Sequence, residues 1–326
     1  DNHLGLYAAR LDFDELTNIN PPPAISTEPV DHEAGFNIYE LPFSPMTIDV
    51  EVGRMNYHKY LIQNLKTQIR TERDHHIRID ELAMDVAGGH LDITGAFDGR
   101  NPDLIYLDPI IKVRDLDLDQ LLLKFDSFGQ DEIVAENLHG RLSGTITGHI
   151  HVHPDLVPKI DDSEIHMDIE VLDGRLEDYP PILALSDYFG DKNLKVVRFD
   201  SLRNHLDMKN GVLNIPNMTL NTTLGHMDFS GSQKASGDYD MEYFVRVPFK
   251  MVTGAAKQKL FGKKDKREAE MAAEAAAEDD EIIYKDESKR IRYLNVKITG
   301  NPDEYSIGLG KDKREKRRKR RNKEEA

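Results

Sequence analysis

The sequence predicts a mainly β protein in which a largely antiparallel sheet dominates and helices are few and short. Three observations support this fold class: period-two alternation of apolar and polar residues, turn-forming pairs between the alternating runs, and few helical patterns. In the run 165–171, every odd-numbered residue is apolar and every even-numbered residue is polar. A strand with this pattern buries one face and exposes the other to water.

The alternating runs are spread over most of the chain and are separated by residues that favour tight turns. Strands are expected at residues 142–152, 165–171, 243–247 and 294–298. Gly-containing pairs and triplets tolerate the positive φ that short hairpin loops require. They predict turns at Gly88-Gly89, Asp98-Gly99, Asp173-Gly174, Asn210-Gly211 and Ser236-Gly237-Asp238.

Two short helices are expected. The first covers residues 118–125, with Asp119 as its N-cap, because an aspartate side chain can accept a hydrogen bond from an unpaired N–H of the first turn. The second covers residues 181–189 and begins at a proline, which lacks an N–H that the first turn would leave unpaired.

Composition divides the chain into five segments. In chain order these are a Pro-rich, partly ordered lead-in (1–45), a β domain (46–254), a charged Ala/Glu-rich insert (255–281), a final β-hairpin (282–310) and a disordered polybasic tail (311–326). The β domain contains a possible internal repeat of units 46–118 and 162–248. Each unit begins with an alternating strand and a Gly-Arg pair and continues to a Gly-marked run.

Charge is distributed unevenly along the 326 residues. The chain has 43 Lys and Arg against 59 Asp and Glu, for a net charge of −16, although residues 311–326 hold ten basic and four acidic residues. The acidic body repels nucleic-acid phosphates, so no nucleic-acid partner is expected. The basic tail is either a solubilising segment or a segment that binds phosphates, including anionic lipid headgroups.

Residue types and segments that the sequence lacks exclude several kinds of site. The chain has no cysteine, which excludes disulfides and thiolate metal sites. No run approaches the 18 apolar residues of a membrane-spanning helix. The chain opens on Asp1 without a signal peptide, and we expect a processed or truncated piece of a longer protein.

No catalytic motif is present. A phosphate-binding loop, a Gly-x-Ser-x-Gly elbow and a His-Glu-x-x-His pair are all missing, so the chain is predicted not to be an enzyme and to need no cofactor. The weak candidate for a metal site is the set His149, His151 and His153, which alternate along one strand and so share a face. The favoured alternative is that these histidines belong to a solvent-facing edge of the sheet.

Four short motifs point to a family. They are Asn137-Leu138-His139-Gly140-Arg141-Leu142-Ser143-Gly144, Phe199-Asp200-Ser201-Leu202, Asn210-Gly211-Val212-Leu213 and Phe229-Ser230-Gly231-Ser232. In order and spacing they resemble the C-terminal region of the AsmA family, over about residues 80–248. The sequence departs from that pattern at Gln233, where a second glycine is common, and in the charged insert before the last hairpin.

The resemblance implies a long curved antiparallel sheet that forms a groove or open half-barrel, as in the similar bridge-like lipid-transfer proteins. It also implies a periplasmic protein of Gram-negative bacteria, anchored to the inner membrane by a missing N-terminal segment. Such a protein acts in phospholipid transport to, or maintenance of, the outer membrane. The residues expected to line the groove are Ile165, Met167, Ile169, Val171, Tyr243, Val245 and Val247.

Two alternatives stay open. The same side chains can pack the core of an ordinary β-sandwich. The chain can also be a non-enzymatic structural or interaction module that binds an envelope protein partner at a free sheet edge. An exposed apolar surface of several hundred Å² favours the lipid function, whereas a sealed core with one long free edge favours a protein partner.

Overall fold

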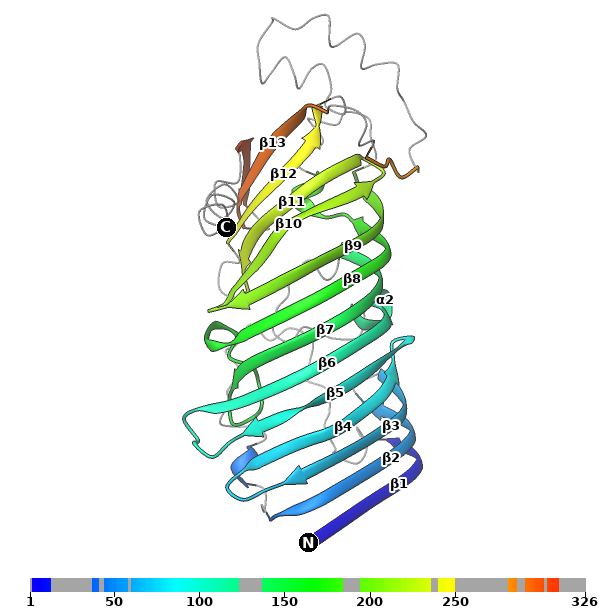
Figure 1. Cartoon of the computed structure of the whole chain (residues 1–326), viewed down its shortest axis with the longest axis vertical. Coiled ribbons are helices and arrows are strands. Elements are labelled where there is room, and N and C mark those ends of the chain that lie inside the picture. Colours follow the sequence, from blue (N-terminus) through cyan, green and yellow to red (C-terminus); the bar gives the residue numbers. More distant parts are fainter. Residues whose placement is uncertain are drawn as a thin grey trace, which may run out of the picture. The chain divides into compact units, whose positions relative to one another are not determined.

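The computed structural model describes residues 2–12, 37–40, 44–57, 60–122, 137–183, 194–235, 240–249, 281–285, 291–301 and 304–310. These residues form one open sheet of 14 strands, which follow one another from β1 to β14 in sequence order (Figure 1). The predicted mainly β fold with few short helices is confirmed. The sheet is mixed, however, because β1 and β2 are parallel.

The strands have the following bounds: β1 (Asn2–Asp12), β2 (Met46–Tyr57), β3 (Tyr60–Thr71), β4 (His76–Val86), β5 (Gly89–Asp98), β6 (Ile105–Asp117), β7 (Leu138–Val152), β8 (Glu164–Glu177), β9 (Val196–Lys209), β10 (Val212–Thr222), β11 (Gly225–Lys234), β12 (Met241–Pro248), β13 (Tyr293–Gly300) and β14 (Tyr305–Leu309). The short helical segments are η1 (Ile38–Glu40), α2 (Leu118–Leu122), η3 (Ile160–Asp162) and α3 (Pro180–Leu183). All four predicted alternating runs lie in strands, and the final hairpin is formed by the antiparallel pair β13 and β14.

Most of the predicted turns lie between strands. The glycine pair at residues 88–89 joins β4 to β5, and Gly99 follows the end of β5. At the turn between β9 and β10, Asn210 and Gly211 have φ values of 50° and 67°, in the left-handed region that this residue pair tolerates. The predicted turn at 236–238 lies outside the described residues.

The turn predicted at Asp173-Gly174 is wrong, because both residues lie inside β8. Asp173 has a φ of 49°, which marks a local irregularity of the strand. A Cβ atom added to Gly174 would lie 2.1 Å from ring atoms of Phe199 on β9. The glycine is therefore needed to make room for an aromatic ring that crosses the strand, a requirement that a local turn pattern does not reveal.

The predicted N-cap of the first helix is also wrong. Helix α2 begins at Leu118, but Oδ1 of Asp117 accepts hydrogen bonds from the N–H groups of Asp119 and Gln120, at 3.0 and 3.3 Å. The last residue of β6 thus caps the helix that follows it. Residues 123–125 and 184–189, predicted as the ends of the two helices, lie outside the described residues.

The chain divides into two compact units. Unit 1 comprises residues 1–131, 141–169 and 205–212, and unit 2 comprises residues 132–140, 170–204 and 213–326. Two clusters of buried side chains lie in unit 1, one around Val52 and Val113 and the other around Phe97 and Ile105. A larger cluster lies in unit 2 around Tyr243. The internal repeat suggested by the sequence stays a prediction.

Among the described residues, no helix is both long enough and apolar enough to cross a bilayer.

Candidate functional site

A continuous row of side chains crosses seven neighbouring strands of unit 1. Each member is the direct cross-strand partner of the next, from β1 to β7. This central row consists of Leu6, Val50, Thr67, Leu82, Ile93, Ile111 and Ile146. Six of its seven members are aliphatic, so the row is apolar on every strand except β3, where Thr67 stands.

Two further rows flank the central row on the same face. One joins Leu4, Ile48, Ile69, Ile79, Gly95 and Pro109 through successive strand pairs. The other contains Ala8, Val52 and Leu65 on β1 to β3 and Met84, Leu91 and Val113 on β4 to β6. Together with the central row they form what we call the inner apolar face.

The inner apolar face follows from strand geometry. Side chains at alternate positions point to the same side of a sheet, and antiparallel pairing aligns the apolar positions of adjacent strands. Thr67 is the single polar member of the central row, and its hydroxyl donates a hydrogen bond to the carbonyl of Glu81 at 2.8 Å. Its polar atom is therefore satisfied within the protein.

Short segments cover the inner apolar face at both ends of the strands. At one end α2 packs near Tyr60, whose hydroxyl donates a hydrogen bond to the carbonyl of Leu121 at 2.7 Å. Burial raises the pKa of Tyr60 well above its usual value. At the other end, Ile38 of η1 is buried against Phe97 and Ile105.

Between these ends the central row is less well covered. Leu6 is 43% exposed. Leu82, Ile93, Ile111 and Ile146 are neither fully buried nor fully exposed, although they occupy the middle of the apolar face. Exposed apolar area of this kind, arranged in a contiguous row, is typical of a surface that binds a ligand or partner.

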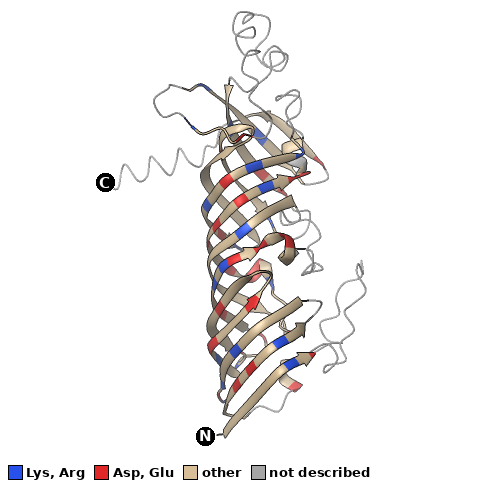
Figure 2. Ribbon diagram, turned by 90° about the vertical axis from the view of Figure 1, so that its right-hand side faces the viewer, with Lys and Arg blue, Asp and Glu red and all other residues tan. Residues whose placement is uncertain are grey.

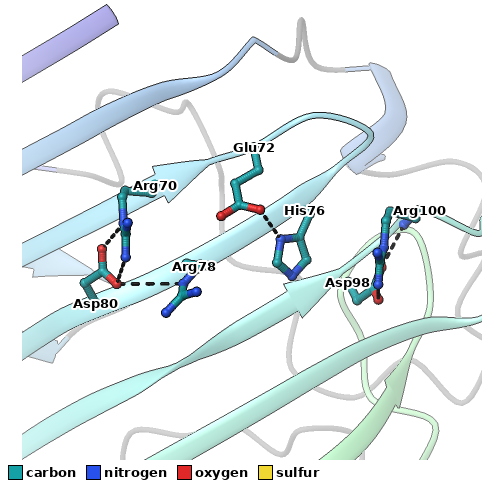
Figure 3. A network of polar contacts seen from close by, with 7 residues as sticks. All are labelled: Arg70, Glu72, His76, Arg78, Asp80, Asp98 and Arg100. Carbon is teal, nitrogen blue, oxygen red and sulfur yellow. Dashed lines mark hydrogen bonds and ion pairs between the residues drawn. The ribbon is translucent and has the colours of Figure 1, made fainter. Parts of the chain in front are cut away.

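The outer face of the same strands is polar. Lys and Arg lie close to Asp and Glu on neighbouring strands (Figure 2). The guanidinium of Arg70 on β3 donates to Asp80 on β4, with Nη2 2.7 Å from Oδ1 (Figure 3). Close by, Nδ1 of His76 lies 2.9 Å from Oε2 of Glu72 (Figure 3). The outer face is therefore suited to water and the inner apolar face is not.

The pKa shifts on the outer face have electrostatic causes. The hydrogen bond from Arg70 lowers the pKa of Asp80. The hydrogen bond from Arg100 lowers the pKa of Asp98 to about 2. Pairing thus favours the charged form of both carboxylates, and neither shows the raised pKa of a buried catalytic acid.

A cavity of about 680 Å³ lies near α2, at the turn between β4 and β5 and the adjoining parts of β3 and β6. Tyr60 and Val86 provide apolar lining, whereas Asp85, His90 and Arg114 provide charged or polar atoms. Tyr60 and Val86 belong to the buried cluster around Val52, so the cavity combines apolar side chains of that cluster with polar groups.

Three of the seven residues predicted to line a groove lie in unit 1, on the same side of the sheet as the inner apolar face. Ile165, Met167 and Ile169 alternate with polar residues that pair across the outer face, and all three are partly exposed. These three extend the inner apolar face onto β8. Exposure at these positions is compatible with the predicted role.

The other four predicted lining residues are buried in unit 2. Val171 and Tyr243 are 0% exposed, and Val245 and Val247 are 1% exposed. Tyr243, Val245 and Val247 pack in a core cluster with Ile182 and Leu194, so they contact protein instead of lining an exposed surface. These residues are buried as the alternative interpretation expects, although the described strands form one sheet and not a β-sandwich.

The histidines considered as a weak metal site have separate partners. Nδ1 of His149 lies 2.6 Å from Asp108, and its ring stacks on Tyr106 with centroids 4.1 Å apart. His151 is buried, with Nδ1 3.6 Å from Asp162. His153 lies just beyond the end of β7. His149 and His151 thus bind different carboxylates.

Sequence reasoning missed most of the inner apolar face. Leu82, Ile93 and Ile111 were not predicted as lining, although each stands in an alternating run of the kind that identified Ile165 and Ile169. The signal that finds them is the register of the strands, because only pairing shows that they belong to one row. The polybasic tail at 311–326 lies outside the described residues.

Comparisons of the chain with protein-family models, with curated proteins and with solved structures found no match.

Proposed function

We propose that the inner apolar face of unit 1 binds the acyl chains of phospholipids and provides a passive path for them. The observation that carries this proposal is the central row, which crosses seven strands and is left partly exposed in its middle. A path of this kind needs no catalytic residue. It needs only continuous apolar surface.

The length of the central row suits an acyl chain. Seven adjacent strands are separated by six intervals of about 4.8 Å, so the row extends about 29 Å. The hydrocarbon core of a bilayer is about 30 Å thick and one leaflet accounts for about half of it. The row is thus longer than the acyl chains of one phospholipid and leaves room for movement along it.

The energetics also favour an amphipathic ligand. Each CH₂ group transferred from water to an apolar surface contributes up to about 0.8 kcal/mol, so several groups in contact give appreciable binding. The polar headgroup would lie in the cavity near α2, where Arg114 and His90 line the wall beside the apolar Tyr60. Because successive positions of the row are chemically similar, no single position traps the chain.

The biological setting of the proposal comes from the sequence resemblance. In an AsmA-like protein this region would lie in the periplasm of a Gram-negative bacterium and be held at the inner membrane by a segment outside this sequence. It would then act in phospholipid transport to the outer membrane or in the maintenance of that membrane.

Neighbouring residues of β6 offer a matched test. Ile111 belongs to the central row, whereas Ile110 lies on the outer face and is 45% exposed. We would compare wild type, Ile111→Asp and Ile110→Asp after incubation of the full chain with phospholipid vesicles that contain a fluorescent phospholipid. Bound lipid would be counted by native mass spectrometry and by fluorescence, and folding checked by circular dichroism.

Wild type and Ile110→Asp should carry phospholipid, and Ile111→Asp should carry at least fivefold less while remaining folded. Both variants introduce the same charge on the same strand, so their difference isolates the inner apolar face. Equal loading of the two variants, or a folded wild type that takes up no lipid, would refute the proposal.

A second candidate function is supported by β1. This 11-residue strand is the first of the sheet, no described strand pairs with its other edge, and Leu4 and Tyr7 are 55% and 68% exposed. Such an edge can accept a strand from an envelope protein partner. A proline at Tyr7, which lies on the other face of β1 from the central row, would weaken binding by strand addition and leave phospholipid loading of the inner apolar face unchanged, which distinguishes the two functions.

A further inference from the structure

Four polar side chains of β8 and β9 gather on the outer face of unit 1. His166 and Asp168 come from β8, and His205 and Asp207 come from β9. Nδ1 of His166 lies 2.6 Å from Oδ1 of Asp207, and Nδ1 of His205 lies 2.5 Å from Oδ1 of Asp168. Two His–Asp pairs therefore connect the strands, and the two imidazole rings stack with centroids 6.4 Å apart.

Three of these side chains bring metal-binding atoms together. Nε2 of His205 lies 3.3 Å from Oδ1 of Asp207, the same oxygen that contacts His166. Ligand atoms of His166, His205 and Asp207 all lie within 4.8 Å of one another. Within the part of the chain that the structure describes, no other three His, Asp or Glu side chains meet this condition.

The donor set is one that zinc prefers. Two imidazole nitrogens and one carboxylate oxygen form a common three-ligand zinc site, with bonds of about 2.0–2.2 Å. Ligands of a tetrahedral ion with such bonds lie about 3.3 Å apart, so the most distant pair of ligand atoms needs to move closer by up to about 1.5 Å. The side chains of His166 and His205 are 46% and 53% exposed, which leaves their rotamers free to adjust.

Asp168 completes the arrangement. A histidine that binds a metal usually donates its other ring N–H to a carboxylate, which fixes the tautomer and the orientation of the ring. The contact between Nδ1 of His205 and Asp168 has this form and directs Nε2 toward Asp207. Asp168 is therefore a positioning residue for His205.

We propose that His166, His205 and Asp207 bind one Zn²⁺ ion, with water at the remaining coordination position. The ion links β8 to β9 across the outer face. This site is independent of the inner apolar face, which lies on the opposite side of the strands. Zn²⁺ that binds only the folded chain stabilises it. Once the zinc concentration exceeds the dissociation constant, the free energy of unfolding rises with the logarithm of that concentration.

Isothermal titration of the chelator-treated full chain with ZnCl₂ tests the site. We expect one Zn²⁺ per chain with a micromolar dissociation constant, weakened at least tenfold by His166→Ala and by His205→Ala. Asp168→Ala should weaken binding less. His149→Ala is the matched control, because His149 is an exposed histidine that pairs with a single aspartate on the outer face.

Thermal unfolding gives a second readout that does not depend on heats of binding. Zn²⁺ should raise the unfolding midpoint of wild type and of His149→Ala, and it should leave that of His205→Ala unchanged. Absence of binding tighter than millimolar in wild type, or equal affinities of wild type and His205→Ala, would overturn the proposal.

Discussion

The central row of unit 1 and the core of unit 2 have the same construction but differ in exposure. In unit 2, Val245 on β12 is the cross-strand partner of Val296 on β13, and the two are 1% and 2% exposed. In unit 1, Ile93 on β5 is the partner of Ile111 on β6, and both remain partly exposed. An aliphatic pair on one face of a sheet is thus sealed in one region and accessible in the other.

The difference comes from what packs on the apolar face. In unit 2, Ile182 of α3 and Leu194, in the segment before β9, join the buried cluster, and Leu183 packs against it. In unit 1, α2 and η1 lie near the ends of the strands, at Tyr60 and Phe97. Alternation therefore determines which face is apolar, whereas the segments between strands determine whether that face is closed.

The largest expected effect is a charge placed in the closed core. Val245→Asp buries a carboxylate without a partner, and we expect unit 2 to lose more than about 4 kcal/mol of stability. Ile111→Asp places the same group on the partly exposed face and should cost about 1–2 kcal/mol. Urea unfolding of both variants measures the difference, and equal losses would show that the two regions are covered alike.

Alkaline pH should affect the core of unit 2 through Tyr243. This side chain is 0% exposed, its hydroxyl donates a hydrogen bond to Gln233, and burial raises its pKa to about 12. In the unfolded chain the pKa is about 10, so only the unfolded state loses this proton between pH 10 and 12. Stability is fully present below pH 10 and falls by about 1.4 kcal/mol per pH unit above it.

Tyr243→Phe provides the control for this titration. The variant should lose about 1–3 kcal/mol at neutral pH because Gln233 is left without its hydroxyl donor. Between pH 10 and 12 its stability should fall less steeply than that of wild type. Parallel pH profiles from urea unfolding would contradict the assignment of this titration to Tyr243.

Gly174→Ala should be the next most damaging change to unit 2. The added methyl would lie 2.1 Å from ring atoms of Phe199, which is 2% exposed. We expect a loss of about 1–3 kcal/mol from this overpacking. Gly308→Ala, where nothing lies within 4 Å of the new methyl, should change the unfolding midpoint little. Similar midpoints for both variants would argue against the close approach at Gly174.

The smallest expected effect concerns the outer face of unit 1. The side chains of Arg70 and Asp80 are 46% and 24% exposed, so water and salt screen their ion pair (Figure 3). A double-mutant cycle with Arg70→Ala and Asp80→Ala should give a coupling close to the precision of the unfolding measurement. The pKa of Asp80 is lowered in the folded chain, so any coupling should be present at neutral pH and vanish as acid protonates this carboxyl. A large coupling that persists in high salt would contradict this expectation.

Much of the sheet could be predicted from the sequence because strand alternation and turn chemistry are local. The run at 165–171 and the Asn210-Gly211 turn depend on residues that are adjacent in the chain. The predictions that were wrong depend on distant or competing partners. Asp173-Gly174 has the composition of a turn, but Phe199 on the next strand decides its structure.

The candidate site was predictable only in part for the same reason. Ile165 and Ile169 were expected on an accessible apolar face and are partly exposed, whereas Tyr243 and Val245 show the same alternation and are buried. Alternation gives the direction of a side chain relative to its own strand. It contains no information on what packs above that strand.

The sequence by itself determined that this protein is a sheet with one apolar and one polar face, because the period of two is a property of each strand. The tertiary structure decided three further things: which apolar positions join into the central row, where that row stays partly exposed, and which histidines and aspartates meet on the outer face. Each depends on register and on the packing of segments far apart in the chain. The pairing of Ile93 with Ile111 and the approach of His166 to Asp207 are set by strand neighbours and not by local sequence.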